Sequence, residues 1–261
     1  MQMCAEIIEH ELGEVRKNAF LCVADIIVVF AKQLNNKYPS LSSLVYTPNY
    51  VFQETCATFA TTYAFSNLNV REEEDEDEDE NTESEVEELN NKRVVLAGLC
   101  KLLSFGIFDM RLATVLFAHL ISAYGNFGDL IKQTMAKCKE KNVNYYTKTL
   151  ALTLFQEYER LPVGENGLIN KTSQEYIALK DLARRFALSY GIELTKEAIR
   201  KAMINLHREG ILHSFRRDKH DEEEEEENEV ISDSRITFPF IGFLDVIIEC
   251  SSRLIPQDKK A

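Results

Sequence analysis

Two consecutive amphipathic helices, predicted between Ser173 and Gly210, constrain the fold of this chain more than any other feature of its sequence. In each, apolar residues recur at a spacing that puts them on one side of a helix with 3.6 residues per turn. The two stripes are Leu179, Leu182, Ala183, Phe186, Ala187 and Tyr190, and then Ala198, Ile199, Ala202, Met203 and Leu206. We expect Gly191 to end the first helix, Thr195 to cap the second and Gly210 to stop it. Because such a pair cannot cover its own apolar side, further helices must flank it.

Similar patterns predict helices along the rest of the chain, over 14–34, 48–65, 85–104, 111–124, 127–139, 144–160 and 240–254, and residues 1–12 are interpreted as the end of a further helix. The expected inward stripe of the first is Val15, Ala19, Val23, Ile26, Phe30 and Leu34, and that of the second is Val51, Phe52, Thr55, Phe59, Thr62 and Tyr63. Gly125 and Gly128 predict a tight corner, with Asp129 in the first turn of the helix that follows. Helix pairs recur about every forty residues, the period of HEAT and armadillo repeats. The sequence therefore predicts an all-α fold, a HEAT-like solenoid of antiparallel helix pairs over 1–261.

The net charge of −13 comes from two acidic runs, nine residues at 72–80 and seven at 221–227. The remaining 27 acidic residues face 30 Lys and Arg, so the body of the chain is slightly basic. Like charges repel and bury nothing, so we expect disordered loops at about 71–84 and 220–234, which short Gly/Ser linkers could replace.

The cysteines and histidines indicate neither a metal site nor catalysis. The six cysteines include no CxxC pair, and Cys22, Cys56 and Cys100 fall in apolar helical runs, as buried thiols do in a reducing compartment. His207 and His213 are six residues apart, which places them on different faces of a helix. No phosphate loop, GxSxG or HExxH motif is present. We expect a binding protein that is not an enzyme, with no cofactor and no metal.

Membrane insertion and secretion are not expected either. The most apolar window, 19–31, is too short for a bilayer and contains Asp25, so it is interpreted as a core helix. Glu6, Glu9 and Glu11 stand where a signal peptide would carry basic residues.

A winged helix-turn-helix is the alternative interpretation of 173–240. Lys196, Arg200 and Lys201 would lie on the recognition helix, and Ile211–Arg217 and Arg235–Phe240 would form the wing strands. The wing tip would then be the run DEEEEEE, which a phosphate backbone repels. A milder expectation is weak, salt-dependent DNA contact without sequence specificity, through Arg184, Arg185, Arg200 and Lys201.

Five segments carry a resemblance to a known family: VRKNAFLCVADIIVVF (15–30), NKRVVLAGLCKLLSF (91–105), YGNFGDLIKQTMAK (124–137), LARRFALSYG (182–191) and FLDVIIECSSRLIPQDKK (243–260). In order and spacing they resemble the C-terminal part of the HEAT-repeat body of the cohesin subunit called stromalin or stromal antigen. The resemblance implies a nuclear, chromosome-associated scaffold for sister-chromatid cohesion and chromosome segregation. Its partner would be the kleisin subunit, and through it the two structural-maintenance-of-chromosomes subunits.

The resemblance also implies two kleisin-contacting positions. They are an acid in the YGNFGDLIK corner, here Asp129, and a basic residue in the LHREG turn, here Arg208. From residue type alone another interpretation stays open, in which Asp129 caps its helix and Arg208 is a solvated surface charge.

Overall fold

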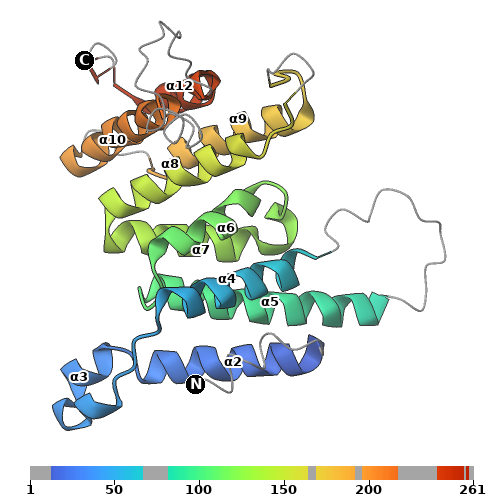
Figure 1. Ribbon diagram of the computed structural model, residues 1–261, viewed down its shortest axis with the longest axis vertical. Helices are drawn as coiled ribbons and strands as arrows, with labels where there is room; N and C mark the ends of the chain where they lie inside the picture. Colours follow the sequence, from blue (N-terminus) through green and yellow to red (C-terminus); the bar gives the residue numbers. More distant parts are fainter. Residues whose placement is uncertain are drawn as a thin grey trace, which may run out of the picture. The chain divides into compact units, whose positions relative to one another are not determined.

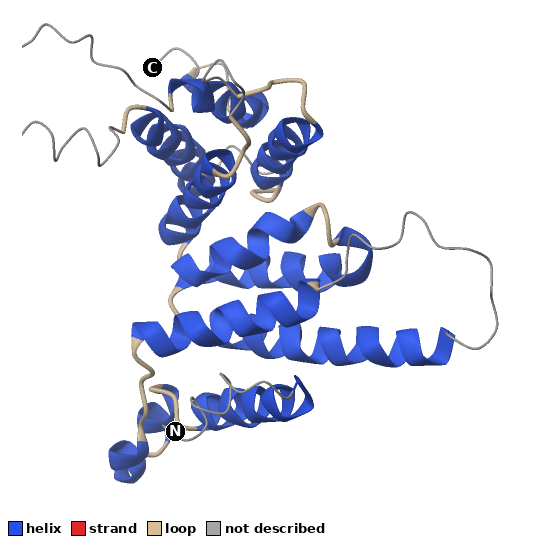
Figure 2. Ribbon diagram, turned by 45° about the vertical axis from the view of Figure 1, so that its right-hand side comes forward, coloured by secondary structure: helices blue, strands red, loops and turns tan. Residues whose placement is uncertain are grey.

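The computed structural model describes residues 13–66, 82–163, 169–191, 196–216, 240–255 and 257–258, and these are almost entirely helical (Figures 1 and 2). One isolated antiparallel bridge, Val163 to Ile169, is the only β pairing within these ranges. Within each unit the helices pack on one another in a way consistent with a helical-repeat solenoid, which confirms the predicted fold class. The chain divides into two compact units, Met1–Asn142 and Val143–Ala261. That they form one continuous solenoid stays a prediction.

Unit 1 is organised around one long central helix, α5, on which α2, α4 and α7 all pack. Its described elements are α2 (Gly13–Val29), α3 (Gln33–Lys37), η1 (Pro39–Leu44), α4 (Tyr50–Phe65), α5 (Thr82–Ser104), η2 (Met110–Ala113), α6 (Thr114–Phe117), η3 (Ala118–Leu120) and α7 (Tyr124–Lys141). Gly98 lets α2 approach α5 closely, because a Cβ there would lie 3.0 Å from the Phe20 ring. Residues 82–84, expected in the first acidic loop, begin α5 instead; most of both acidic loops, and the expected helix over 1–12, lie outside the described residues.

The helices expected over 14–34 and 48–65 exist, but their inward faces were mostly wrongly predicted, with Val23 and Phe59 buried as expected. In α2 the buried residues are Phe20, Val23, Ala24 and Ile27, whereas Val15, Cys22 and Ile26 are exposed. In α4 the core side consists of Gln53, Cys56, Ala57, Phe59, Ala60, Thr61 and Ala64, and Val51 and Thr62 face solvent. Both helices are apolar over more than one side, so the position of the apolar residues alone does not fix their orientation.

The corner expected at Gly125 and Gly128 is also wrong. Both glycines lie inside α7, and Gly128 is buried there against Tyr124. The expected helix over 111–124 is instead divided into η2, α6 and η3, although Leu112, Leu116 and Leu120, which share one side of the expected helix, are all buried. The turn therefore comes before Tyr124.

Unit 2 contains α8 (Val143–Glu159), α9 (Gln174–Leu188), α10 (Glu197–Ser214), η4 (Ile241–Phe243), α12 (Leu244–Ile248) and η5 (Glu249–Arg253). Ser173 caps α9 by accepting a hydrogen bond from the Tyr176 N–H. All six residues of the first predicted stripe are buried, and so are Ala202, Met203 and Leu206 of the second, whereas Ala198 is exposed and Ile199 is half-buried. The main partner of α10 is α8, and α9 packs on η5 and α8, so both predicted helices are flanked as expected.

The structure contradicts the first wing strand that the winged helix-turn-helix interpretation requires. Ile211 was expected to begin a strand, but α10 continues through Ser214. Gly210 does not stop this helix: it is buried within it, where a Cβ would lie 2.4 Å from the Ile247 side chain. Gly210 is thus a site of close packing between α10 and α12. Gly191 does follow α9 with a φ of +89°, as expected, whereas the cap position of α10 is Lys196 and Thr195 lies outside the described residues.

The helical stretch Gly13–Lys37 is 25 residues long and apolar enough to cross a membrane by length and composition, with 28% of its most apolar window buried. The expected window was therefore too short. One such helix is weak support for a membrane span, since core helices of soluble proteins meet the same criterion, and Phe20 and Ile27 of α2 are fully buried in unit 1.

Candidate partner-binding surfaces

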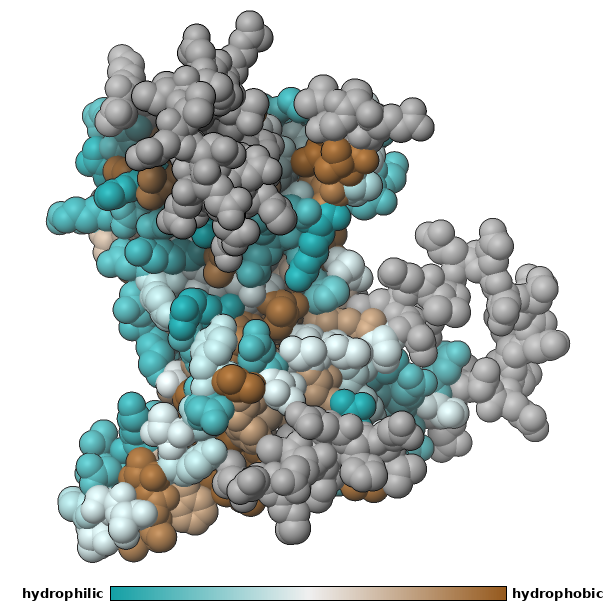
Figure 3. Space-filling model, in the orientation of Figure 1, coloured by the Kyte–Doolittle hydropathy of each residue, from teal (hydrophilic) through white to brown (hydrophobic). Residues whose placement is uncertain are grey.

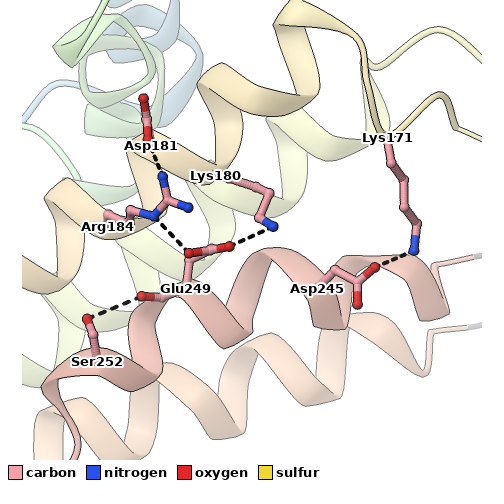
Figure 4. Close-up of polar contacts among 7 residues, drawn as sticks. All are labelled: Lys171, Lys180, Asp181, Arg184, Asp245, Glu249 and Ser252. Atoms are coloured by element: carbon pink, nitrogen blue, oxygen red, sulfur yellow. Dashed lines mark hydrogen bonds and ion pairs between the residues drawn. The ribbon is translucent and has the colours of Figure 1, made fainter.

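A carboxylate on η5 holds two basic side chains of α9 (Figure 4). Lys180 Nζ lies 2.6 Å from Glu249 Oε1, and Arg184 Nε lies 2.8 Å from Glu249 Oε2. Burial alone would raise the pKa of the Glu249 carboxyl, but the hydrogen bonds from Lys180 and Arg184 outweigh it and lower that pKa. Lys171, which precedes α9, also pairs with Asp245 of α12. These pairs join α9 to the C-terminal helices.

The basic residues expected to contact DNA are therefore largely engaged within the protein. Besides its pair with Glu249, Arg184 donates to Asp181, and Arg200 makes a two-point pair with Asp258, with Nε to Oδ2 at 2.7 Å. Lys201 pairs with Glu197 one turn away, and Arg185 also has a contact. Each carboxylate cancels part of the charge that a phosphate backbone would meet. DNA contact through this face stays a prediction.

Asp129, the first expected kleisin contact, is bound to a neighbouring helix. It is the sixth residue of α7, so the expectation that it lies in the first turn is wrong. Arg93 of α5 clamps its carboxylate, with Nη2 to Oδ2 at 2.5 Å and Nη1 to Oδ1 at 3.1 Å. The hydrogen bond from Arg93 is the main reason why the pKa of Asp129 is lowered. The Asp129 side chain is nevertheless largely exposed, so one edge of the carboxylate can still meet a partner.

Arg208, the second expected contact, lies in different surroundings. It is exposed on α10 and makes no ion pair or hydrogen bond with any other residue in the described ranges. Ile204 and Ile211 stand one turn before and one turn after it, and Leu212 is beside them; all three are exposed. Residues at these spacings share one side of a helix, so Arg208 is a lone cation within an apolar stripe. We call Ile204, Arg208, Ile211 and Leu212 the α10 stripe.

The match to a protein-family model follows the division of the chain into unit 1 and unit 2. The model of the STAG protein C-terminal domain matches residues 144–261, which is nearly the whole of unit 2. Cohesin subunit SA-1 of Xenopus laevis is 30% identical over 261 residues, covering 100% of this chain and 20% of that relative. Cohesin subunit SA-3 of Homo sapiens is 29% identical over 99% of this chain, and cohesin subunit scc-3 of Caenorhabditis elegans is 26% identical over 100% of it.

This chain belongs to the cohesin SA family. It spans 20% of the length of each of the two vertebrate SA subunits and 22% of the worm subunit. The two positions expected to bind the kleisin lie in different units of this SA chain, Asp129 in unit 1 and Arg208 in unit 2. Within the described residues, no group of three or more His, Cys, Asp or Glu could hold a metal ion.

Sequence reasoning missed the apolar side chains that surround Arg208. Most of the inward stripe of α10 was identified, and Lys196, Arg200, Lys201 and Arg208 were expected to form its charged side. A signal was present, because Ile204, Arg208 and Ile211 recur at helical spacing away from the core stripe. This second pattern was missed because the helix was expected to end at Gly210, before Ile211 and Leu212.

Proposed function

We propose that this chain is part of a non-enzymatic cohesin subunit that binds the kleisin, and through it joins the ring formed with the structural-maintenance-of-chromosomes subunits. Its place would be the chromosome in the nucleus, in sister-chromatid cohesion and chromosome segregation. Membership of the SA family supports this role, because the relatives are named as cohesin subunits.

The observation that carries the proposal is the α10 stripe. An exposed guanidinium that pairs with none of the described acidic residues, between exposed isoleucines, suits a partner segment that brings a carboxylate flanked by apolar side chains. Water leaves the apolar surface when the partner binds, and the guanidinium then gives the partner its register through a two-point hydrogen bond.

Calorimetry with a central kleisin fragment at physiological salt tests the proposal. We expect Arg208→Glu to weaken binding at least tenfold, or about 1.4 kcal/mol, with the melting temperature unchanged. Lys137→Glu is the control, since Lys137 is an exposed lysine of α7 whose pair with Glu140 is local to one helix turn. The proposal is wrong if the parent chain does not bind the fragment, or if both variants bind as the parent does.

Whether Asp129 contacts the kleisin needs a second comparison, because its carboxylate already forms an ion pair with Arg93. Arg93→Gln and Asp129→Asn both break the internal pair, so both lower the melting temperature. If the carboxylate contacts the kleisin, only Asp129→Asn also loses affinity. An equal affinity for the two variants would leave Asp129 a purely structural residue.

A further inference from the structure

The middle of the segment that joins α2 to α4, residues 32–44, is ordered although none of its side chains is buried. Its two short helices, α3 and η1, contain no buried residue. Three large side chains face solvent there, Tyr38 at 48%, Leu41 at 39% and Leu44 at 51% exposure. We call residues 32–44, which include the N-cap residue Lys32, the α3–η1 corner. Figures 1 and 2 show it beyond the end of α2, and brown side chains stand out among paler ones at this corner in Figure 3.

Backbone hydrogen bonds, and not a core, hold the corner in shape. The Tyr46 N–H donates to the Phe30 carbonyl at 2.8 Å and closes its base. Inside it, Tyr38 donates to the Leu34 carbonyl and Leu41 to the Tyr38 carbonyl, at 2.8 and 2.9 Å. Short helices without tertiary packing are marginal in water, and apolar side chains gain free energy when they are covered. The corner is thus a preformed apolar surface without a cover among the described residues.

The charge of this region restricts what can cover it. No acidic residue occurs between Asp25 and Glu54, whereas the corner contains Lys32 and Lys37. Lys32 makes no ion pair with any residue in the described part of the chain, and Lys37 lies over the Tyr38 ring at 5.5 Å. The surface is therefore apolar at its centre and positive at its edge.

We propose that the α3–η1 corner is a docking site for a short partner segment that carries carboxylates next to apolar side chains. The partner's apolar side chains would cover Tyr38, Leu41 and Leu44, and its carboxylates would pair with Lys32 and Lys37. This surface is in unit 1 and shares no residue with the α10 stripe, so it goes beyond the kleisin contact proposed above.

Two other occupants fit less well. In a symmetric dimer the same patch faces itself, so a second copy of the chain would bring Lys32 and Lys37 toward their own equivalents. An anionic membrane attracts clusters of four or more basic residues, and this corner has two lysines among serines and asparagines.

A peptide selection tests the proposal directly. The whole chain is used to select from a random 12-residue phage-displayed library, with the double variant Leu41→Ser/Leu44→Ser as counter-selection. Enriched peptides are then synthesised, and their binding is measured by fluorescence anisotropy. We expect peptides in which Asp or Glu adjoins Leu, Ile or Phe. Their affinity should fall at least tenfold for the double variant and for Lys32→Glu/Lys37→Glu.

Ile248→Ser is the matched control, because Ile248 is an exposed isoleucine of α12 in the other unit, and it should leave the affinity unchanged. The substituted corner residues are not buried, so all variants should melt as the parent does. The proposal is wrong if no peptide is enriched, if the enriched peptides are neutral or basic, or if they bind the variants equally. Self-association in sedimentation, or co-sedimentation with phosphatidylserine vesicles, that disappears in the corner variants would also overturn it, in favour of a second copy or a membrane.

Discussion

Helices α9 and α2 have similar lengths and both pack on neighbours, yet their sequences are not equally informative. In α9 every residue of the predicted stripe is buried, and charged residues mark the opposite side. In α2 the residues from Phe20 to Ala31 include a single charged side chain, Asp25, and the predicted inward face was mostly wrong. The comparison teaches that the buried side of a helix can be predicted where polar residues mark the opposite side, because apolar residues occur on buried and exposed sides alike.

The most decisive comparison uses two adjacent isoleucines of α2. Ile27 is fully buried and Ile26 is 41% exposed, although the sequence pattern predicted Ile26 as the inward residue. We expect Ile27→Ala to cost about 2–5 kcal/mol of unfolding free energy, because it leaves a cavity. Ile26→Ala should cost less than about 0.5 kcal/mol. Denaturant unfolding measures both, and the reverse order would restore the predicted face.

Gly210 in unit 2 allows a second comparison between the predicted and the observed position of a residue. If it were the helix stop predicted from the sequence, with a positive φ, Gly210→Ala would cost about 1 kcal/mol whatever residue stands at position 247. Inside α10, the new Cβ would meet the Ile247 side chain, and we expect a loss of about 1–3 kcal/mol from overpacking. The loss should shrink in an Ile247→Ala background, and equal costs in both backgrounds would mean that the two residues do not compete for space.

The ion pairs of unit 2 should differ in strength in the same way that their burial differs. Glu249 is largely buried and holds Lys180 and Arg184, so Glu249→Gln should cost about 1 kcal/mol. Glu197 is exposed, and Glu197→Gln should leave the free energy of unfolding unchanged within error. Thermal melts of the two variants make the comparison, and an equal effect would remove the structural role assigned to Glu249.

The smallest effect concerns pH. His213 stacks on Phe155, and burial, with a further contribution from the Arg216 charge, lowers the pKa of its imidazole. Since the folded-state pKa is below the unfolded one, this group's contribution to stability is complete above about pH 6.5 and is lost as the pH falls. We expect the melting temperature of His213→Phe to fall less than that of the parent between pH 7.5 and 5.5. Parallel curves would show that His213 does not carry this dependence.

Much of the fold, but little of the surface, could be predicted from the sequence. The all-helical class and the packed side of α9 follow from residue periodicity, which reports burial directly. The ion pairs of Arg93 with Asp129 and of Arg200 with Asp258 could not be foreseen, because they join residues 36 and 58 positions apart. Periodicity says nothing about which surface charge meets which. The basic residues expected on the outer side of the second of the two amphipathic helices include Arg200 and Lys201, which form ion pairs, and Arg208, which has no ion-pair partner among the described residues.

The central claim is that the lone cation of the α10 stripe meets a carboxylate of the kleisin, and a charge-swap cycle measured by calorimetry tests it most directly. Each acidic residue of the central kleisin fragment is changed to Lys in turn and measured against the parent chain and against Arg208→Glu. We predict that one substitution weakens binding to the parent at least tenfold and restores binding to Arg208→Glu, since the swapped charges attract again. If no acidic position of the fragment shows this rescue, Arg208 does not contact a kleisin carboxylate.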